Sequence, residues 1–348
     1  MNVNKDYFPY SVNIELTRAC NLRCLHCGST AGKSLSQELT LAEYDELFKG
    51  LYELGCHEVC LLGGEPFIRK DWYEIAQNCC DNGLNILFVT NGWLCSKEIL
   101  NKLKRLDNVQ RIGVSIDSAY EKEHDFIRGR EGAFASAFKT AYALRDAGFE
   151  TGIITTLSKI NISRFGDLKD RLYQQNFTWQ IQVAAPQGDR FDRRYVLSLP
   201  EYYQVGKTIS NWRNSISIRD LPVCGGHDVG YFSQHFSNYS ELSKWHGCGA
   251  GLYTLGVVSD GRIKGCLCHH DDFSQGNIRE RSIVDIWKDK HLFLRNRNFN
   301  RDLLEGYCKD CPYGSDCRAG CSNLAYNITG STYNNPYCFY SIEKRGIA

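Results

Sequence analysis

Three cysteines stand close together near the start of the chain, at Cys20, Cys24 and Cys27, with the spacing C-x3-C-x2-C. They follow a short apolar run, residues 12–16, so we expect them on a loop directly after a β-strand. A closed zinc site usually takes four ligands, which is one more than this loop offers. A cubane iron–sulfur cluster has four irons, so three thiolates leave one iron open to another ligand. Three buried cysteines or a partial zinc loop are the alternatives, and the motifs that follow along the chain decide against them.

A second motif, residues 63–66, follows the apolar run 57–62 and reads Gly63, Gly64, Glu65 and Pro66. Glycines at the end of a strand let the backbone approach a ligand closely, and a neighbouring carboxylate suits an ammonium group. The motif is weak evidence alone. Its position, one strand–helix unit after the cysteine loop, makes it specific.

In this order, the cysteine loop and the Gly-Gly-Glu-Pro motif resemble the radical S-adenosylmethionine (radical SAM) superfamily. In that family the open iron chelates the amino and carboxylate groups of the methionine moiety, and reductive cleavage yields a 5′-deoxyadenosyl radical. The resemblance implies S-adenosylmethionine as a cofactor and a [4Fe–4S] cluster on the three cysteines.

The overall composition excludes several other classes. The 348 residues carry a net charge of +1 with a pI of about 7.5, so nothing favours binding to nucleic acid or a membrane surface. No apolar run approaches the length of a membrane helix, and residues 1–10 lack a signal-peptide pattern. We expect a cytoplasmic protein, in which clustered cysteines among the 17 are more typical of metal ligands than of disulfides.

Short β-like runs alternate with amphipathic helical stretches up to about residue 215. One such stretch is residues 41–51, for which Thr40 is the predicted N-cap and Glu43, three residues later, completes a capping box. This alternation predicts an α/β fold with a parallel sheet and helices on its outer face. The predicted strands are 12–17, 57–62, 84–90, 110–116, 150–156 and 179–184. Six units match the partial (β/α)6 TIM-type barrel of the radical SAM family over residues 1–215, with sites at the carboxyl ends of the strands.

Polar residues at these strand ends are candidates for contact with the cofactor. By resemblance, Ser115 is assigned to the methionine carboxylate or ribose, Asp117 to the ribose hydroxyls, and Arg128 to the carboxylate, which a guanidinium binds well. Asn91 ends the third strand and is a further candidate, and the backbone of His26 is expected to contact adenine. The alternative for each is a strand cap or a surface salt bridge. The cofactor-binding set is His26, Gly63, Gly64, Glu65, Pro66, Asn91, Ser115, Asp117 and Arg128.

Composition changes after residue 215. Residues 216–247 form a predicted connecting segment near the substrate opening, and its aromatic residues argue against a disordered linker. A hairpin is predicted around Asp260 and Gly261, and it would bring Cys248 and Cys266 together. A short helix is predicted to bury Ile283, Ile286 and Trp287. The cysteine pattern of residues 248–348 resembles the SPASM domain, which carries two auxiliary [4Fe–4S] clusters.

The resemblance therefore implies three clusters, one that binds S-adenosylmethionine and two auxiliary ones. The outer auxiliary cluster takes Cys308, Cys311, Cys317 and Cys338, and the inner one takes Cys248, Cys266 and Cys321. The fourth ligand of the inner cluster is left open between Cys224, Cys268 and an open iron that could bind substrate. A pair of zinc sites is the alternative for this region.

The function that follows from the resemblance is the removal of a hydrogen atom from a ribosomally made precursor peptide. The product would be a thioether, C–C or C–O crosslink, or a related change such as excision or epimerisation, and the sequence does not choose among them. A flavodoxin or ferredoxin is expected as the reductant. Because the first strand begins near residue 11, we expect either a separate leader-binding protein or an enzyme that reads the core of the peptide directly. The alternatives are formylglycine formation (against which Leu267 counts), a small-molecule enzyme acting on a tetrapyrrole or a quinone cofactor, and a non-enzymatic iron–sulfur or zinc scaffold.

Overall fold

The computed structural model describes residues 7–240 and 245–348. Residues 1–6, which belong to the stretch searched for a signal peptide, and residues 241–244 of the predicted connecting segment lie outside the described residues. Within these ranges, no helix combines the length and the apolar character that a membrane span needs.

A single ten-stranded sheet forms the centre of the molecule, with the strand order β10-β9-β8-β1-β2-β3-β4-β5-β6-β7. The six predicted strands are present and pair in parallel from β1 to β6, which confirms the α/β class and the partial barrel. Their bounds are β1 (Ser11–Glu15), β2 (Glu58–Leu62), β3 (Asn85–Thr90), β4 (Val109–Ser115), β5 (Thr151–Leu157) and β6 (Thr178–Val183).

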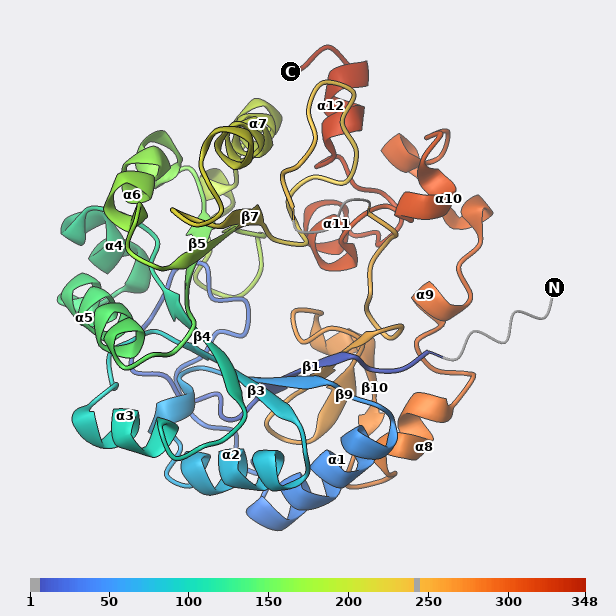
Figure 1. The fold of residues 1–348 in the computed structure, drawn as a ribbon. Coiled ribbons are helices and arrows are strands. Elements are labelled where there is room, and N and C mark those ends of the chain that lie inside the picture. The colour runs from blue at the N-terminus through green and yellow to red at the C-terminus, as the bar shows by residue number, and fades with distance from the viewer. Residues whose placement is uncertain (1–6, 241–244) are drawn as a thin grey trace.

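Helices α1 to α7 lie around the outside of this sheet (Figure 1). The first of them begins where predicted, because the Thr40 hydroxyl accepts from the Glu43 backbone and the Glu43 carboxylate accepts from the Thr40 backbone. Their bounds are α1 (Leu41–Glu53), α2 (Trp72–Asp81), α3 (Lys97–Leu103), α4 (Glu121–Arg128), α5 (Ala133–Asp146), α6 (Phe165–Leu172) and α7 (Leu199–Ser215).

The hydrophobic core lies between the sheet and these helices. On α1, the buried residues Tyr44, Leu47, Phe48 and Leu51 share one face at helical spacing. At the other end of the barrel, the indole of Trp179 on β6 stacks on that of Trp212 on α7, with ring centroids 5.4 Å apart. The two faces of β6 can therefore be assigned. Trp179 points to the helix layer, and its neighbour Gln180 points into the barrel.

The predicted connecting segment contributes a strand of its own. β7 (Val223–Gly225) pairs in parallel with β6 and extends the barrel sheet by one strand. Tyr231 is buried, and Phe232, Phe236, Tyr239 and Trp245 pack against the core. The described part of the segment is thus folded, as its aromatic content predicted.

The cysteine-rich region continues the same sheet beyond β1. The predicted hairpin is present as β8 (Thr254–Val257) and β9 (Arg262–Lys264), with β10 (Ser274–Asn277) after it. β8 also pairs in parallel with β1, which the sequence did not predict. The Ser259 hydroxyl donates to the buried Glu15 carboxylate at 2.9 Å and fixes the same junction.

Short helices complete this region and close the remaining side of the molecule (Figure 1). The predicted helix is α8, and it buries Ile283, Ile286 and Trp287. The helices are α8 (Ile283–Lys288), α9 (Leu294–Arg297), α10 (Gly314–Cys317), α11 (Ser322–Thr329) and α12 (Phe339–Lys344). The 3-10 turns are η1 (Pro66–Ile68), η2 (Ile162–Arg164), η3 (Arg193–Tyr195), η4 (Asp271–Phe273), η5 (Arg301–Leu303) and η6 (Gly306–Cys308).

Candidate functional site

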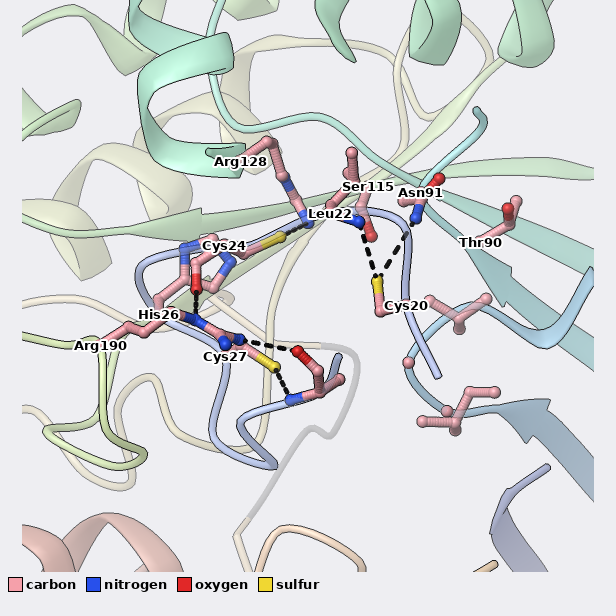
Figure 2. Close-up of a pocket in the computed structure, with 15 residues that line it drawn as sticks. Cys20, Leu22, Cys24, His26, Cys27, Thr90, Asn91, Ser115, Arg128 and Arg190 are labelled. Atoms are coloured by element: carbon pink, nitrogen blue, oxygen red, sulfur yellow. Dashed lines mark hydrogen bonds between the residues drawn. The ribbon is translucent and has the colours of Figure 1, made fainter. Parts of the chain in front are cut away.

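A cavity of about 160 Å³ lies at the carboxyl ends of β2, β3 and β4, beneath the cysteine loop (Figure 2). The three predicted thiols line it together with residues from these strand ends and from α4. Its full lining is Cys20, Leu22, Cys24, His26, Cys27, Ala31, Leu62, Gly63, Gly64, Val89, Thr90, Asn91, Ser115, Arg128 and Arg190.

Each of the three thiols receives a hydrogen bond from the surrounding protein. Cys20 accepts from the Leu22 backbone at 3.4 Å and from the Asn91 amide at 3.8 Å. Arg128 donates to the Cys24 sulfur at 3.8 Å, and the Ala31 backbone donates to the Cys27 sulfur at 3.3 Å (Figure 2). Donors of this kind stabilise thiolates, which is the form that binds iron.

The cysteine loop is held in place by two arginines from distant parts of the chain. The Arg23 backbone donates to the Arg128 carbonyl at 3.1 Å, which fastens the loop to the end of α4. Arg190, which follows β6, donates to the carbonyls of Cys24 at 3.1 Å and Ala31 at 3.2 Å (Figure 2). The loop is therefore fixed on both sides of Cys24.

A buried ion pair stands behind the cavity. The Asp117 carboxylate is fully buried and lies 2.7 Å from Arg128 and 3.8 Å from the imidazole of His26, and it accepts from the Thr156 backbone at 2.9 Å. Burial raises the pKa of Asp117, but the Arg128 guanidinium, together with weaker contributions from His26, His124 and the Thr156 backbone, outweighs this effect and the pKa lies below its usual value. Burial lowers the pKa of His26 to about 4, so this imidazole is neutral at pH 7.

These contacts change the role expected of Asp117. Arg128, His26 and Ser115 line the cavity, but Asp117 does not, because its carboxylate is occupied by Arg128 and Thr156. Asp117 therefore positions Arg128 behind the cavity, and its contact with the ribose hydroxyls stays a prediction.

The two glycines of residues 63–66 are required by a close approach of two backbone segments. A Cβ on Gly63 would lie 2.4 Å from the Thr17 carbonyl, and one on Gly64 would lie 2.2 Å from the Ala19 carbonyl. The Gly64 backbone donates to Thr17 at 2.8 Å, so this approach pins the motif to the start of the cysteine loop. Both glycines line the cavity, but what they approach in the structure is the loop itself.

Glu65 and Pro66 do not line the cavity. The Glu65 carboxylate is fully buried and accepts from the Thr90 hydroxyl and the Asn91 backbone, both at 2.8 Å. Burial raises its pKa to about 7 in spite of these donors. The carboxylate expected to meet an ammonium group instead joins the end of β2 to that of β3 and orients Asn91.

The sequence did not single out Arg190, Thr90 or Leu22 as site residues. Thr90 could have been found from its place at the end of β3, next to Asn91. Arg190 lies seven residues beyond the end of β6, in a segment without periodic pattern, and only the tertiary structure brings it to the loop.

The residues around the cavity fit an iron–sulfur cluster together with S-adenosylmethionine. Burial raises the pKa of Cys20 to about 11, so a cationic centre is needed to hold this thiol deprotonated at neutral pH. Among the described residues, no three His, Cys, Asp or Glu side chains converge on a point that suits a single metal ion. Three thiols spread around one cavity suit a group larger than one ion, and the donors described above suit thiolate ligands.

Two groups of cysteines form in residues 248–348. Cys317 and Cys338 each interact electrostatically with Cys308 and Cys311, which brings the four predicted outer ligands together. The second group is the predicted inner set, in which Cys266 interacts with Cys248 and Cys321. Cys266 also shares a hydrogen bond with Cys268. Cys224 lies on β7, opposite Gln180 of β6.

Comparison with known proteins identifies both regions. Residues 14–172 match the family model described as the radical SAM superfamily, and residues 248–312 match that of an iron–sulfur cluster-binding domain, SPASM.

Two relatives and one solved structure illustrate the range of similar proteins. An AdoMet-dependent heme synthase of Methanosarcina barkeri is 31% identical over 97% of this chain and 98% of its own length. A mycofactocin maturase, MftC, of Mycobacterium tuberculosis is 27% identical over 94% of this chain and 82% of its own. The structure of Streptococcus suis SuiB bound to the precursor peptide SuiA superposes with a TM-score of 0.75 at 17% identity, covering 94% of this chain and 75% of that one.

Proposed function

The chain belongs to the radical SAM superfamily and carries a SPASM domain, and from that premise we propose that it modifies a ribosomally made precursor peptide. As a member of this family it is an enzyme that uses S-adenosylmethionine and [4Fe–4S] clusters. The proposed reaction removes a hydrogen atom from the peptide and leads to a crosslink, an excision or an epimerisation. The proposal includes three clusters, one at the cysteine loop and two in residues 248–348.

The observation that favours a peptide is a cluster of amide side chains between the cysteine loop and the inner cysteine group. The Gln187 side chain lies against Gly28 of the cysteine loop, 3.2 Å from where a Cβ would stand, and donates to the Cys268 carbonyl at 2.8 Å. Asn323 and Asn327 donate to the same Gln187 at 3.1 and 3.3 Å. Neutral amides match the donors and acceptors of a peptide backbone, whereas a polycarboxylate would call for cations.

The chain's own residues have separable roles in this reaction. The bound cluster and cofactor together would supply a 5′-deoxyadenosyl radical. Arg128, held by Asp117, presents a guanidinium suited to the methionine carboxylate, and Ser115 offers a hydroxyl beside it. Asn91 and Arg190 fix the loop that carries the thiols, and so fix where the radical is formed relative to the substrate.

The auxiliary clusters and partner proteins complete the proposal. An electron removed from the substrate radical would pass to an auxiliary cluster, and a flavodoxin or ferredoxin would supply the electron for cofactor cleavage. We also propose a separate protein that binds the leader of the precursor peptide. Tight binding of the leader peptide by the purified enzyme alone would contradict that last element.

The decisive experiment is co-expression with short peptides encoded beside the gene, in deuterated water, followed by intact mass measurement. Loss of two hydrogens indicates a crosslink or desaturation, a larger loss indicates excision, and a gain of one deuterium indicates epimerisation. A variant with Cys20, Cys24 and Cys27 replaced by alanine is the control and should leave the mass unchanged. If the mass is unchanged with the intact enzyme and a leader-binding protein present, the peptide proposal is wrong.

A second candidate is an enzyme that acts on a tetrapyrrole, because the heme synthase of M. barkeri is 31% identical along almost the whole chain. It is tested by incubating the reduced enzyme with S-adenosylmethionine and an iron porphyrin that carries carboxylate side chains. A change in porphyrin mass that requires the three loop cysteines would support this candidate. If only the peptide changes mass, it is excluded.

A further inference from the structure

Two exposed arginines, Arg23 and Arg130, lie on the outer surface of the cysteine loop. Arg23 donates to the carbonyls of Cys20 and Leu22, both at 2.8 Å. Arg130 donates to the carbonyl of Asn21, which stands between them, at 2.9 Å. Three consecutive carbonyls of the loop are thus bound by guanidinium groups that remain in contact with solvent. Each guanidinium has more N–H donors than these bonds use, so donors stay free for a partner.

The same stretch of the loop also lines the cofactor cavity. Cys20 and Leu22 line the cavity with their side chains. The Asn91 amide donates to the Cys20 sulfur at 3.8 Å and to the Asn21 side chain at 2.9 Å. A single stretch of backbone therefore separates the exposed guanidiniums from the thiol of Cys20. An electron that enters here reaches a predicted cluster ligand without crossing the sheet or a helix.

Arg130 is held in place by the indole of Trp93. Its guanidinium carbon lies 3.7 Å from the centroid of the Trp93 ring, which is a cation–π contact. Trp93 is half-buried, and its backbone donates to the Asn91 side chain at 2.9 Å. Arginine and tryptophan are residue types enriched in protein–protein interfaces. Because both side chains are already ordered, a partner that binds them loses less conformational freedom.

The positive charge of this surface is not neutralised by ion pairs. Arg111, on the surface of β4, pairs with a carboxylate at 2.6 Å, whereas Arg23 and Arg130 pair with none within the described ranges. Lys33 is exposed directly after the glycine that lies beside the Arg23 guanidinium. Glu131 is exposed next to Arg130 and forms no ion pair with it, so positive charge exceeds negative charge among Arg23, Lys33, Arg130 and Glu131.

We propose that Arg23, Arg130 and Trp93 form the docking surface for the protein that reduces the loop cluster, a small electron carrier with an acidic surface around its redox centre. Carboxylates of the carrier bind the free guanidinium N–H groups. Opposite charges steer such an encounter without a large interface, as is typical of transient redox complexes. One electron leaves the carrier and enters the cluster, and no bond forms or breaks. The inference rests on the reductant included in the proposed function and is independent of the substrate.

Two reductants separate docking from the chemistry that follows it. Full-length, anaerobically reconstituted enzyme receives electrons either from recombinant flavodoxin, kept reduced by its NADPH-dependent reductase, or from dithionite, which needs no docking surface. The readouts are bleaching of the visible cluster absorption and formation of 5′-deoxyadenosine, both without peptide. Arg130→Glu should lower the flavodoxin-supported rates by about tenfold and leave the dithionite-supported rates at the parent level.

Two further variants control for the loop and for net charge. Arg130→Gln keeps an N–H donor for the Asn21 carbonyl and removes only the charge, so it guards against a displaced loop. Its flavodoxin-supported rates should fall as well. Arg219→Glu is the matched control, because Arg219 is exposed just before β7, at the amino end of a strand, whereas the cavity lies at carboxyl ends. This variant should change the rates with neither reductant.

Binding gives a second readout that does not depend on turnover. The affinity of flavodoxin for the enzyme, measured by surface plasmon resonance, should weaken in Arg130→Glu and, for the parent, as the salt concentration rises. Equal losses with flavodoxin and dithionite would show that Arg130 only holds the loop, and would overturn the proposal. A parent that dithionite reduces and flavodoxin does not, or an equal loss in Arg219→Glu, would overturn it too. If flavodoxin supports cleavage but no peptide changes mass, only the peptide proposal fails.

Discussion

The cysteine loop and the cysteine-rich region hold their cysteine side chains in place in two different ways. The loop carries its three thiols within eight residues, Cys20 to Cys27, and the barrel braces it from behind through Arg128, Arg190 and the glycines of residues 63–66. The predicted inner ligands Cys248, Cys266 and Cys321 come from segments up to 73 residues apart, next to β8, β9 and α11. The ligands of the loop can be recognised from their spacing, whereas the inner set follows only from the resemblance to the SPASM domain, which leaves its fourth member open.

The largest expected effect is a loss of S-adenosylmethionine cleavage that leaves the iron of the cysteine-rich region in place. Cys24→Ala removes a thiol from the loop, and 5′-deoxyadenosine formation should fall to background when dithionite and S-adenosylmethionine are supplied. The two cysteine groups of residues 248–348 share no residue with the loop, so their iron should remain. Iron loss well beyond one cluster would show that the two regions depend on each other for assembly.

The next effect tests the brace behind the loop. Asp117→Asn leaves the buried Arg128 guanidinium without its carboxylate partner, and the loss of one member of a buried pair costs about 3–5 kcal/mol of unfolding free energy. Denaturant unfolding of the anaerobic protein measures this cost. Glu150→Gln is the control, because Glu150 pairs with Arg111 at the surface and should contribute no more than about 1 kcal/mol. Similar costs for the two variants would contradict the role given to Asp117.

A glycine substitution tests the contact between the Gly-Gly-Glu-Pro motif and the start of the cysteine loop. Gly64→Ala places a Cβ 2.2 Å from the Ala19 carbonyl, so one backbone segment must move, at a cost of about 1–3 kcal/mol. Cleavage of S-adenosylmethionine should fall with it, because the start of the loop shifts. Gly166→Ala is the matched control: Gly166 lies in α6 with its nearest neighbour 4.0 Å away, and alanine there should be neutral or stabilising. Unchanged cleavage in Gly64→Ala would mean that the loop tolerates the shift.

The last effect, which is small for each pH unit, is a pH dependence. The folded protein holds a proton on Glu65 more tightly than the unfolded chain does, because burial raises this pKa from 4.5 to about 7. Between these values the folded state binds more protons, so the unfolding free energy falls as pH rises, by at most about 1.4 kcal/mol per pH unit. Glu65→Gln should flatten this slope between pH 5 and 7 in denaturant titrations of the anaerobic protein. An identical slope in both proteins would show that Glu65 is ionised throughout.

The same contrast explains how far the sequence could predict the structure. The six barrel strands, the capped helix α1 and the β8–β9 hairpin were predicted because each has its own pattern or turn signal. β7 has only three residues, Val223–Gly225, and no period to detect. The pairing of β1 with β8 joins segments some 240 residues apart, and neither strand encodes its partner.

Within the site, residue types were easier to predict than side-chain directions. The three loop cysteines, His26, Asn91, Ser115 and Arg128 line one cavity, as a strand-end argument suggests. Glu65 and Asp117 also follow strand ends, yet both carboxylates turn inward, because buried donors from Thr90 and Arg128 satisfy them there. Sequence gives the position of such a carboxylate but not which of its neighbours compensates its burial.

The parallel pairing of β1 with β8 also sets an order of events during synthesis. One of the two neighbours of β1, the strand β8, is made only after more than 240 further residues. Until then β1 has an unpaired edge on the ribosome, and the cysteine loop that follows it lacks half of its sheet support. We expect the nascent chain to need protection of this edge, and the loop to acquire its iron only after β8 has emerged and paired with β1. Pulse-labelled ribosome-bound chains that stop before β8 should accordingly be protease-sensitive around residues 11–32.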